Sequence, residues 1–279
     1  MKLKYLGTAA YEGFPGLFCE CEACKQAEKE GGKNIRTRTS MLINEDTLMD
    51  FSPDAYLHKL KYNLNLAKVR HFVITHSHSD HFNPLDLMAR CEGNYAHFDE
   101  ENKGSIIQVY GNDKVEACLN HAIQIEFGGN QNFIGYTLVT PFKTYEAGTL
   151  KVTPLLAQHQ TDEQSLIYII EEDGKTLLYG NDTGTFPEET FKYLEGVKLD
   201  VVSLDCTNGA RYRGGQGHLG LETCVEIKDR LLQMGSVTKD TIFILTHFSH
   251  NGAMCHEVLE EHANPHGFIV SYDGMELEI

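Results

Sequence analysis

The segment THSHSDH, residues 75–81, constrains this chain more than any other. It places three histidines and one aspartate within seven residues, directly after the short apolar run RHFVIT at 70–75. Such a run predicts a buried β-strand that ends where the histidines begin. A loop at the end of a strand can direct imidazole and carboxylate groups toward one point, and these groups suit zinc, iron or manganese. The sequence therefore predicts metal binding here rather than a solvated polar loop. The candidate ligands are His76, His78, Asp80 and His81.

Four ligands cannot complete two metal sites, so further candidates should follow later strands. Three apolar runs end in a residue of the right kind, in PLLAQHQ, LLYGNDTG and FILTHF, and they offer His159, Asp182 and His247. Each alone is weak evidence, since a histidine after a strand is more often a polar cap. Together with the histidine-rich loop they form a coherent set. Two metals about 3.5–4 Å apart need a bridging carboxylate, for which Asp182 is the candidate.

A second cluster of ligand-type residues lies near the start of the chain, in FCECEACKQA. Three cysteines within six residues, separated by two glutamates and an alanine, are not a core pattern. Tetrahedral zinc accepts three thiolates and needs one further ligand. His250 is the candidate, because His247 lies three residues earlier and a strand points residues an odd number apart to opposite faces. The candidate ligands of this structural zinc are Cys19, Cys21, Cys24 and His250.

Apolar runs of strand length alternate with amphipathic stretches along the chain. The segments 39–51, 165–182 and 267–279 each have the pattern of a hairpin, and the last two carry an Asp-Gly turn. Single strands are expected at 70–75, 105–112, 199–206 and 240–248, and helices at 221–235 and 254–264. Early hairpins followed by strand–helix alternation predict two mixed sheets face to face with helices outside. No linker or repeat divides the sequence, so we expect one domain over 1–279, with a zinc loop inserted near 19–24.

Charge and cysteine content restrict the function. The formal net charge of −16 argues against nonspecific binding of nucleic acid or of an anionic membrane, which requires basic patches. No apolar run approaches the roughly 18 residues that a membrane span needs. The start, MKLKYLGTAAYEG, lacks the apolar stretch of a secretory signal, so we expect a cytoplasmic protein. Thiols stay reduced there, and the eight cysteines then indicate metal binding or catalysis before disulfides.

The order and spacing of the candidate ligands resemble the signature of the metallo-β-lactamase superfamily. This resemblance covers nearly the whole chain and implies an α/β (α+β) fold, a four-layer αββα sandwich with metals in a cleft at one edge. It assigns the first metal to His76, His78 and His159 and the second to Asp80, His81 and His247, with Asp182 bridging. Aspartate at position 80 points to the phosphodiesterase, nuclease and glyoxalase members rather than to lactamases. Asp50 resembles the aspartate that orients ligands there, with an ordinary turn residue as the alternative.

The cysteine cluster, ILTHFSH and the closing GFIVSYDGME resemble the phosphoribosyl cyclic phosphate phosphodiesterases of phosphonate breakdown. They are more distantly similar to the pyrroloquinoline-quinone biosynthesis B proteins. The first resemblance implies a hydrolase that opens five-membered cyclic phosphodiesters of ribose 5-phosphate, often as a homodimer. It also implies a catalytic role for His218, which lies in GQGHLGLET where these enzymes and the tRNA 3′-end nucleases place a histidine facing the metals. A protonated imidazole can donate to a leaving alkoxide, although a polar residue before a helix is the alternative.

The predicted function is hydrolysis of a small anionic phosphodiester such as phosphoribosyl 1,2-cyclic phosphate. Two divalent ions, zinc or manganese, would lower the pKa of a shared water so that hydroxide is available at pH 7. The catalytic candidates are His218, Asp80 and Asp182. The alternatives are another hydrolase on the same centre, acting on a 2′,3′-cyclic nucleotide, a lactone or a thioester, and a noncatalytic biosynthetic accessory protein. Arg211 and Arg213 either clamp a phosphate or, as we favour, are solvated loop charges.

Overall fold

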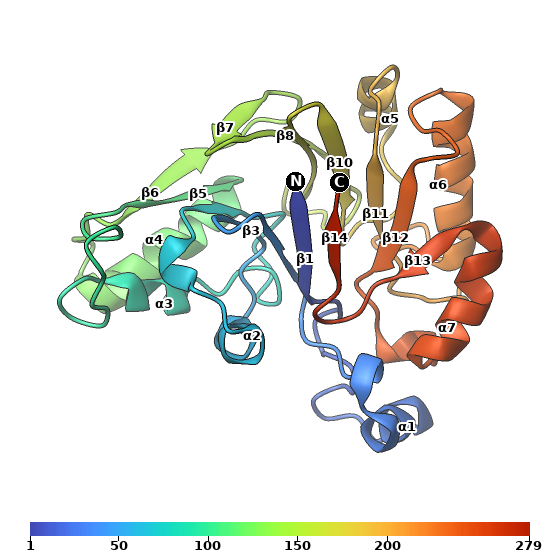
Figure 1. Cartoon of the computed structure of the whole chain (residues 1–279), viewed down its shortest axis with the longest axis horizontal. Coiled ribbons are helices and arrows are strands. Elements are labelled where there is room, and N and C mark those ends of the chain that lie inside the picture. Colours follow the sequence, from blue (N-terminus) through green and yellow to red (C-terminus); the bar gives the residue numbers. More distant parts are fainter.

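Two seven-stranded sheets face each other in the computed structural model, which describes residues 1–279 (Figure 1). The first sheet has the order β14-β1-β2-β3-β4-β5-β6 and the second the order β13-β12-β11-β10-β9-β8-β7. The first consists of β1 (Lys2–Gly7), β2 (Ser40–Ile43), β3 (Thr47–Met49), β4 (His71–Val73), β5 (Ile107–Gly111), β6 (Ile134–Leu138) and β14 (Glu276–Glu278). The second consists of β7 (Tyr145–Ala147), β8 (Leu150–Leu156), β9 (Leu166–Glu172), β10 (Lys175–Gly180), β11 (Val201–Asp205), β12 (Ile242–Thr246) and β13 (Phe268–Val270).

Helices cover the outer face of each sheet (Figure 1). The first sheet carries α2 (Ala55–Tyr62), α3 (Pro84–Leu87) and α4 (Asp113–Phe127), and the second carries α5 (Glu188–Leu194), α6 (Leu221–Gln233) and α7 (His256–Ala263). A further helix, α1 (Glu22–Glu30), lies away from both layers. None of these helices is both long and apolar enough to span a membrane. The predicted αββα sandwich is confirmed.

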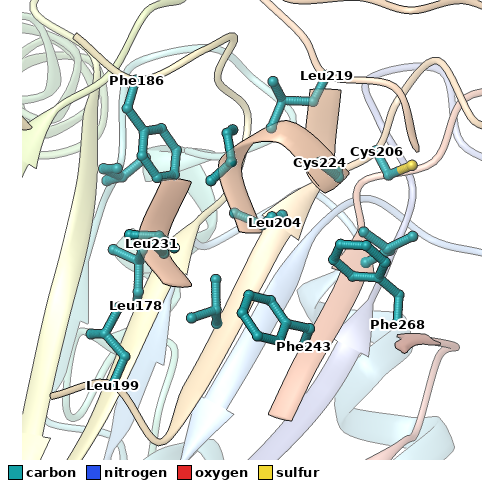
Figure 2. Packing of buried hydrophobic residues seen from close by; sticks show 14 of the residues in the cluster. Leu178, Phe186, Leu199, Leu204, Cys206, Leu219, Cys224, Leu231, Phe243 and Phe268 are labelled. Atoms are coloured by element: carbon teal, nitrogen blue, oxygen red, sulfur yellow. The ribbon is translucent and has the colours of Figure 1, made fainter. Parts of the chain in front are cut away.

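Three buried apolar clusters separate the four layers. One lies between the sheets, and the other two lie between a sheet and its helices. Figure 2 shows the cluster on the second sheet, where Leu178 and Leu204 of the sheet pack toward Leu231 of α6. Cys206 and Cys224 are fully buried in this cluster. Close packing of this kind holds the strand ends in fixed positions.

Parallel pairing brings the carboxyl ends of several strands to one edge. In the first sheet β3, β4, β5 and β6 run parallel, and in the second β10, β11, β12 and β13 do so. Ligand sites in sheets of this kind form where the carboxyl ends of strands meet. The residues that follow β3, β4, β10 and β12 are therefore placed to converge.

The hairpin predicted at 267–279 is wrong, whereas those at 39–51 and 165–182 are confirmed. Strand β13 pairs in parallel with β12, and β14 pairs antiparallel with β1 in the other sheet. The Asp-Gly turn is anchored to the first sheet instead of reversing the chain, because Asp273 accepts hydrogen bonds from Thr37 N at 2.7 Å and Thr8 Oγ1 at 2.8 Å. The same contacts draw the end of the chain onto β1, a strand that the sequence did not predict.

Candidate functional site

The seven predicted ligands of the two-metal centre meet at the edge of the sandwich. The loop 76–81 follows β4, His159 follows β8, Asp182 follows β10 and His247 follows β12. Their nitrogen and oxygen atoms form two groups, each with all atoms within 4.8 Å of one another. The groups are His76, His78, His159 and Asp182, and Asp80, His81, Asp182 and His247. Asp182 belongs to both, which is the position expected of a bridging carboxylate.

The distances around Asp182 are short. Its Oδ2 lies 3.3 Å from His76 Nε2 and 3.0 Å from His81 Nε2. His81 Nε2 in turn lies 3.3 Å from His247 Nε2. Both rings turn Nδ1 toward a carboxylate, that of Asp50 for His81 and that of Asp205 for His247, so as neutral rings both direct a lone pair from Nε2 at the space between them. The geometry therefore favours a positive charge at this point.

Unpaired buried atoms provide a test of whether these residues fit metal ions. His76 Nε2, Asp80 Oδ1 and Asp182 Oδ1 are buried and make no well-directed hydrogen bond, although His76 Nε2 lies 3.3 Å from Asp182 Oδ2 and Asp182 Oδ1 lies 3.0 Å from His218 Nδ1. Such atoms are rare in folded proteins and call for a ligand or ion. Imidazole nitrogen and carboxylate oxygen together suit zinc, manganese or iron. The residues at this site fit a pair of divalent ions.

Two of the inward-facing imidazoles are held from behind by carboxylate and hydroxyl groups. His81 Nδ1 lies 2.8 Å from Asp50 Oδ2, so Asp50 orients this ring and is more than a turn residue. His247 Nδ1 lies 2.8 Å from Thr207 Oγ1 and 3.2 Å from Asp205 Oδ2. Partners of this kind fix the ring orientation and increase its basicity toward a metal.

Backbone conformation at the strand ends aims the side chains inward. Asp50, Asp182 and His247 have φ angles of 57°, 49° and 62°, three of the eight positive values among non-glycine residues. This left-handed region is disfavoured for residues with a Cβ and is concentrated at functional sites. Each of the three follows a strand within two residues, and the turn replaces the alternation that a continued strand would impose.

The carboxylates and imidazoles of the cluster shift one another's pKa. Burial favours the neutral carboxyl, but the imidazoles of His247 and His218 outweigh it and hold the pKa of Asp182 well below its usual range. Burial likewise lowers the pKa of His81, yet Asp80 and Asp50 outweigh burial and raise it. By contrast, burial keeps the pKa of His76, His78 and His159 low, which leaves these rings neutral as metal ligands must be.

The candidate ligands border a cavity of about 490 Å³. His218, in the loop before α6, borders this cavity as well. Its Nδ1 lies 3.0 Å from Asp182 Oδ1 and 3.2 Å from Asp205 Oδ2. Burial lowers the pKa of His218, but these two carboxylates outweigh it and raise the pKa to about 11. The side chain is 35% exposed, and no protein group bonds its Nε2. His218 thus presents a charged imidazole with one free N–H to the cavity.

Asp205 is a site residue that the sequence analysis missed. It is the last residue of β11, is fully buried, and accepts hydrogen bonds from Thr207 N at 3.0 Å and Leu219 N at 2.8 Å. It also contacts the Nδ1 atoms of His218 and His247. The sequence did contain a signal, because the run VVSL is followed directly by Asp205 in the same way that LLYGN is followed by Asp182.

The cysteine cluster forms a separate site with His250. The four candidate ligand atoms lie within 4.8 Å of one another, with His250 Nδ1 3.3 Å from Cys19 Sγ and 3.7 Å from Cys21 Sγ. Burial alone would raise the pKa of Cys21, but bonds from Cys24 and His250 lower it to about 6. Gly16 N also donates to Cys24 Sγ at 3.2 Å. Three free thiols and one imidazole fit a tetrahedral zinc.

The two arginines that could have clamped a phosphate do not border the cavity. Arg213 is more than half exposed and pairs with Glu226 at 2.6 Å and with Glu222 at 3.4 Å. The guanidinium of Arg211 lies over the ring of Tyr212, 5.2 Å from its centroid. The favoured interpretation of both as loop charges agrees with these contacts.

A cavity of about 440 Å³ beside α2 is a second place where a ligand could bind. Its lining is mainly apolar, includes Phe51 and Phe72, and contains none of the candidate ligands. Apolar lining alone does not specify a chemistry, whereas unpaired nitrogen and oxygen atoms converge in the polar cavity. We therefore place the functional site at the polar cavity.

Known proteins share the fold of this chain. A sequence profile of the beta-lactamase superfamily domain matches residues 45–248. No protein with a curated description matches the sequence. A diphosphatase of the PhnP family superposes with a TM-score of 0.75 at 23% identity over 100% of this chain and 96% of the other. Zinc-bound PqqB from Methylobacterium extorquens superposes with a TM-score of 0.72 at 16% identity, over 100% of both chains. Human tRNase Z, short form (ELAC1), superposes with a TM-score of 0.65 at 14% identity, over 100% of this chain and 99% of the other.

Because His247 and His250 belong to different candidate metal sites, substitution of each should have a different effect. His250→Ala should release one zinc and lower the melting temperature, because structural zinc contributes directly to folding. His247→Ala should deplete the cavity site and reduce stability only modestly. Metal analysis and melting curves on both variants measure these effects. Full metal content and an unchanged melting temperature in His250→Ala would contradict the assignment to two sites.

Proposed function

The chain belongs to the beta-lactamase superfamily, and we propose that it is a metal-dependent hydrolase that opens small cyclic phosphodiesters. One observation carries this proposal: Asp182 joins two groups of ligand atoms on the floor of a cavity that His218 also faces. A carboxylate shared by two metal sites suits a two-metal centre, which stabilises in-line displacement at phosphorus.

The ligand atoms divide into two complete sets. One divalent ion would be held by His76, His78 and His159, and the other by Asp80, His81 and His247, with Asp182 between them. When bound, such ions lower the pKa of water and withdraw charge from phosphoryl oxygens. Zinc and manganese both suit these donors. The cysteine cluster with His250 would hold a structural zinc.

His218 supplies the proton that the reaction needs. Water adds to phosphorus, the bond from phosphorus to one ring oxygen breaks, and the leaving alkoxide must be protonated. Asp205 holds Nδ1 of His218 at 3.2 Å, which leaves Nε2–H free to donate to that oxygen. The product is a phosphomonoester with a free hydroxyl.

The polar lining of the cavity favours a phosphodiester over an acyl substrate. Apart from Ala10 and Tyr11, its walls are polar, and Gln160 and Asn208 offer donors to phosphoryl oxygens. A lactone or thioester would bring an apolar chain that these walls do not match. A noncatalytic accessory role would leave the free N–H of His218 without a purpose.

Assay of metal-loaded protein on a cyclic phosphodiester, a lactone and a thioester tests the proposal. Hydrolysis of the phosphodiester alone or by a wide margin is the expected result. Turnover confined to the lactone or thioester would contradict it, as would inactivity on all three.

Removal of ligands should abolish this activity. We expect Asp182→Ala and His81→Ala to lose bound metal and to hydrolyse the cyclic phosphodiester at least ~10³-fold more slowly, because the nucleophile depends on the ions. His121→Ala, at an exposed position on α4, is the matched control and should keep full activity. Elemental analysis and steady-state rates measure both effects. Near-normal turnover in a metal-depleted variant would overturn the mechanism.

The proton-donor role of His218 makes a second prediction. His218→Ala should retain its metals and lose ~10²–10⁴-fold in kcat on substrates with an alkoxide leaving group. The loss should be smaller for nitrophenyl esters, whose leaving group needs little protonation. Rates on both ester types measure the difference, and an equal loss on the two would argue against a proton donor.

A further inference from the structure

The backbone between His76 and His78 is fixed by a carboxylate from a distant part of the chain. Glu163, in the loop between β8 and β9, accepts hydrogen bonds from Ser77 N and Ser77 Oγ, both at 2.7 Å. Ser77 is the residue between the two histidines, so Glu163 holds the chain at the point where it presents two candidate ligands. Hydrogen bonds to a charged acceptor are stronger than those between neutral groups.

Glu163 is itself anchored to a rigid part of the fold. Asn112 Nδ2 donates to Glu163 Oε1 at 2.7 Å and to Gln164 O at 2.9 Å. Asn112 is buried and caps α4, since its Oδ1 accepts a hydrogen bond from Val115 N at 3.0 Å. The histidine loop 76–81 is therefore connected, through one carboxylate, to the start of a long helix packed on the first sheet.

The segment that carries Glu163 also carries His159. Both residues lie between the end of β8 and the start of β9, and Leu166 N, at that start, donates to Thr75 O at 3.0 Å. His159 Nε2 lies 3.3 Å from His78 Nδ1. Glu163 thus joins the two loops that supply all three imidazoles of one candidate metal site.

The position of His78 depends most on this connection. The rings of His76 and His159 are each held by a further protein oxygen, at 3.1 and 3.0 Å from their Nδ1 atoms. Beyond the neighbouring His159, the ring of His78 contacts the amide of Gln160, an exposed side chain, at 2.7 Å. An exposed amide exchanges with water and restrains a ring weakly. The backbone that Glu163 fixes is therefore the main restraint on where this imidazole lies.

We propose that Glu163 is a positioning residue for the metal site formed by His76, His78 and His159, and that it acts through hydrogen bonds rather than through its charge. Groups that hold metal ligands in place typically contribute about 10- to 100-fold to metal affinity or activity. The inference rests on the proposed metal centre and is independent of which ester is hydrolysed there.

Two conservative substitutions separate hydrogen bonding from charge. In Glu163→Gln the amide oxygen can accept from Ser77 N and Asn112 Nδ2, and the amide nitrogen can donate to Ser77 Oγ, because a hydroxyl also accepts. In Glu163→Asp the charge is retained, but the side chain is one methylene shorter and cannot span the same distance. Glu163→Ala removes both the bonds and the charge.

Zinc affinity is the direct measurement. Dialysis against zinc buffered by a chelator, followed by elemental analysis, gives the free zinc concentration at which each site fills. The wild type should bind two ions in the cavity and one at the cysteine cluster. Glu163→Ala and Glu163→Asp should require about 10- to 100-fold more free zinc to fill one of these sites. Glu163→Gln should fill all of them as the wild type does, and so should the matched control Glu195→Ala, at an exposed glutamate after α5.

A double variant identifies which site is weakened. His78→Ala removes a ligand of the site that Glu163 is proposed to support. Adding Glu163→Ala to His78→Ala should therefore release no further zinc, because both changes affect the same ion. Further loss of zinc from the double variant would place the effect of Glu163 at another site and overturn the proposal.

Other outcomes are equally decisive. Wild-type zinc affinity in Glu163→Ala would overturn the positioning role while the metal centre stands. Equal losses in Glu163→Gln and Glu163→Asp would attribute the effect to charge and also overturn it. If Glu163→Ala does not fold, the comparison of Gln with Asp decides, and equal affinities contradict the proposal. A wild type that binds zinc only at the cysteine cluster would overturn the metal centre as well. Full zinc binding without ester hydrolysis would overturn only the proposed function, and the zinc affinities of the variants would still decide the role of Glu163.

Discussion

The buried carboxylate of Asp182, shared between two sets of imidazoles, is the contact on which the rest of the site depends. It lies 3.3 Å from His76 Nε2 and 3.0 Å from His81 Nε2, and it also faces His218. Burying a carboxylate is costly unless cations or donors surround it. Four strand ends, those of β4, β8, β10 and β12, have to deliver their side chains to one point to meet that requirement. The sandwich provides this convergence because its parallel strands end along the same edge.

Residues outside the ligand cluster hold the converging side chains in place. Asp50 and Asp205, each following or ending a strand, hold the outer nitrogens of His81 and His247, and left-handed backbone turns the chain inward beyond the strands. The cysteine cluster also connects the N-terminal loop to the cavity. His250 Nε2 lies 3.5 Å from the Glu12 carboxylate, which borders the cavity. A structural zinc at this cluster would therefore fix one wall of the cavity.

Much of this architecture was accessible from the sequence, for identifiable reasons. Periodicity revealed most of the strands, though not β1, β6 or β7. Ligand-type residues directly after apolar runs identified His159, Asp182 and His247 as residues that the fold brings together. The missed features depend on tertiary contacts. The last two strands pair with different sheets because Asp273 bonds to Thr37, which no local pattern encodes. Asp205 was overlooked because one acidic residue in a strand has many ordinary explanations. The contacts of Glu163 join segments that lie far apart in the sequence, and composition cannot specify them.

Anomalous X-ray diffraction from crystals of the metal-loaded wild type tests the central claim most directly. Data collected on both sides of the absorption edges of zinc and manganese locate each ion and identify its element. The account predicts two peaks about 3.5–4 Å apart with Asp182 between them, and a third, zinc peak among Cys19, Cys21, Cys24 and His250. A single ion in the cavity, or two ions that do not share Asp182, would contradict it.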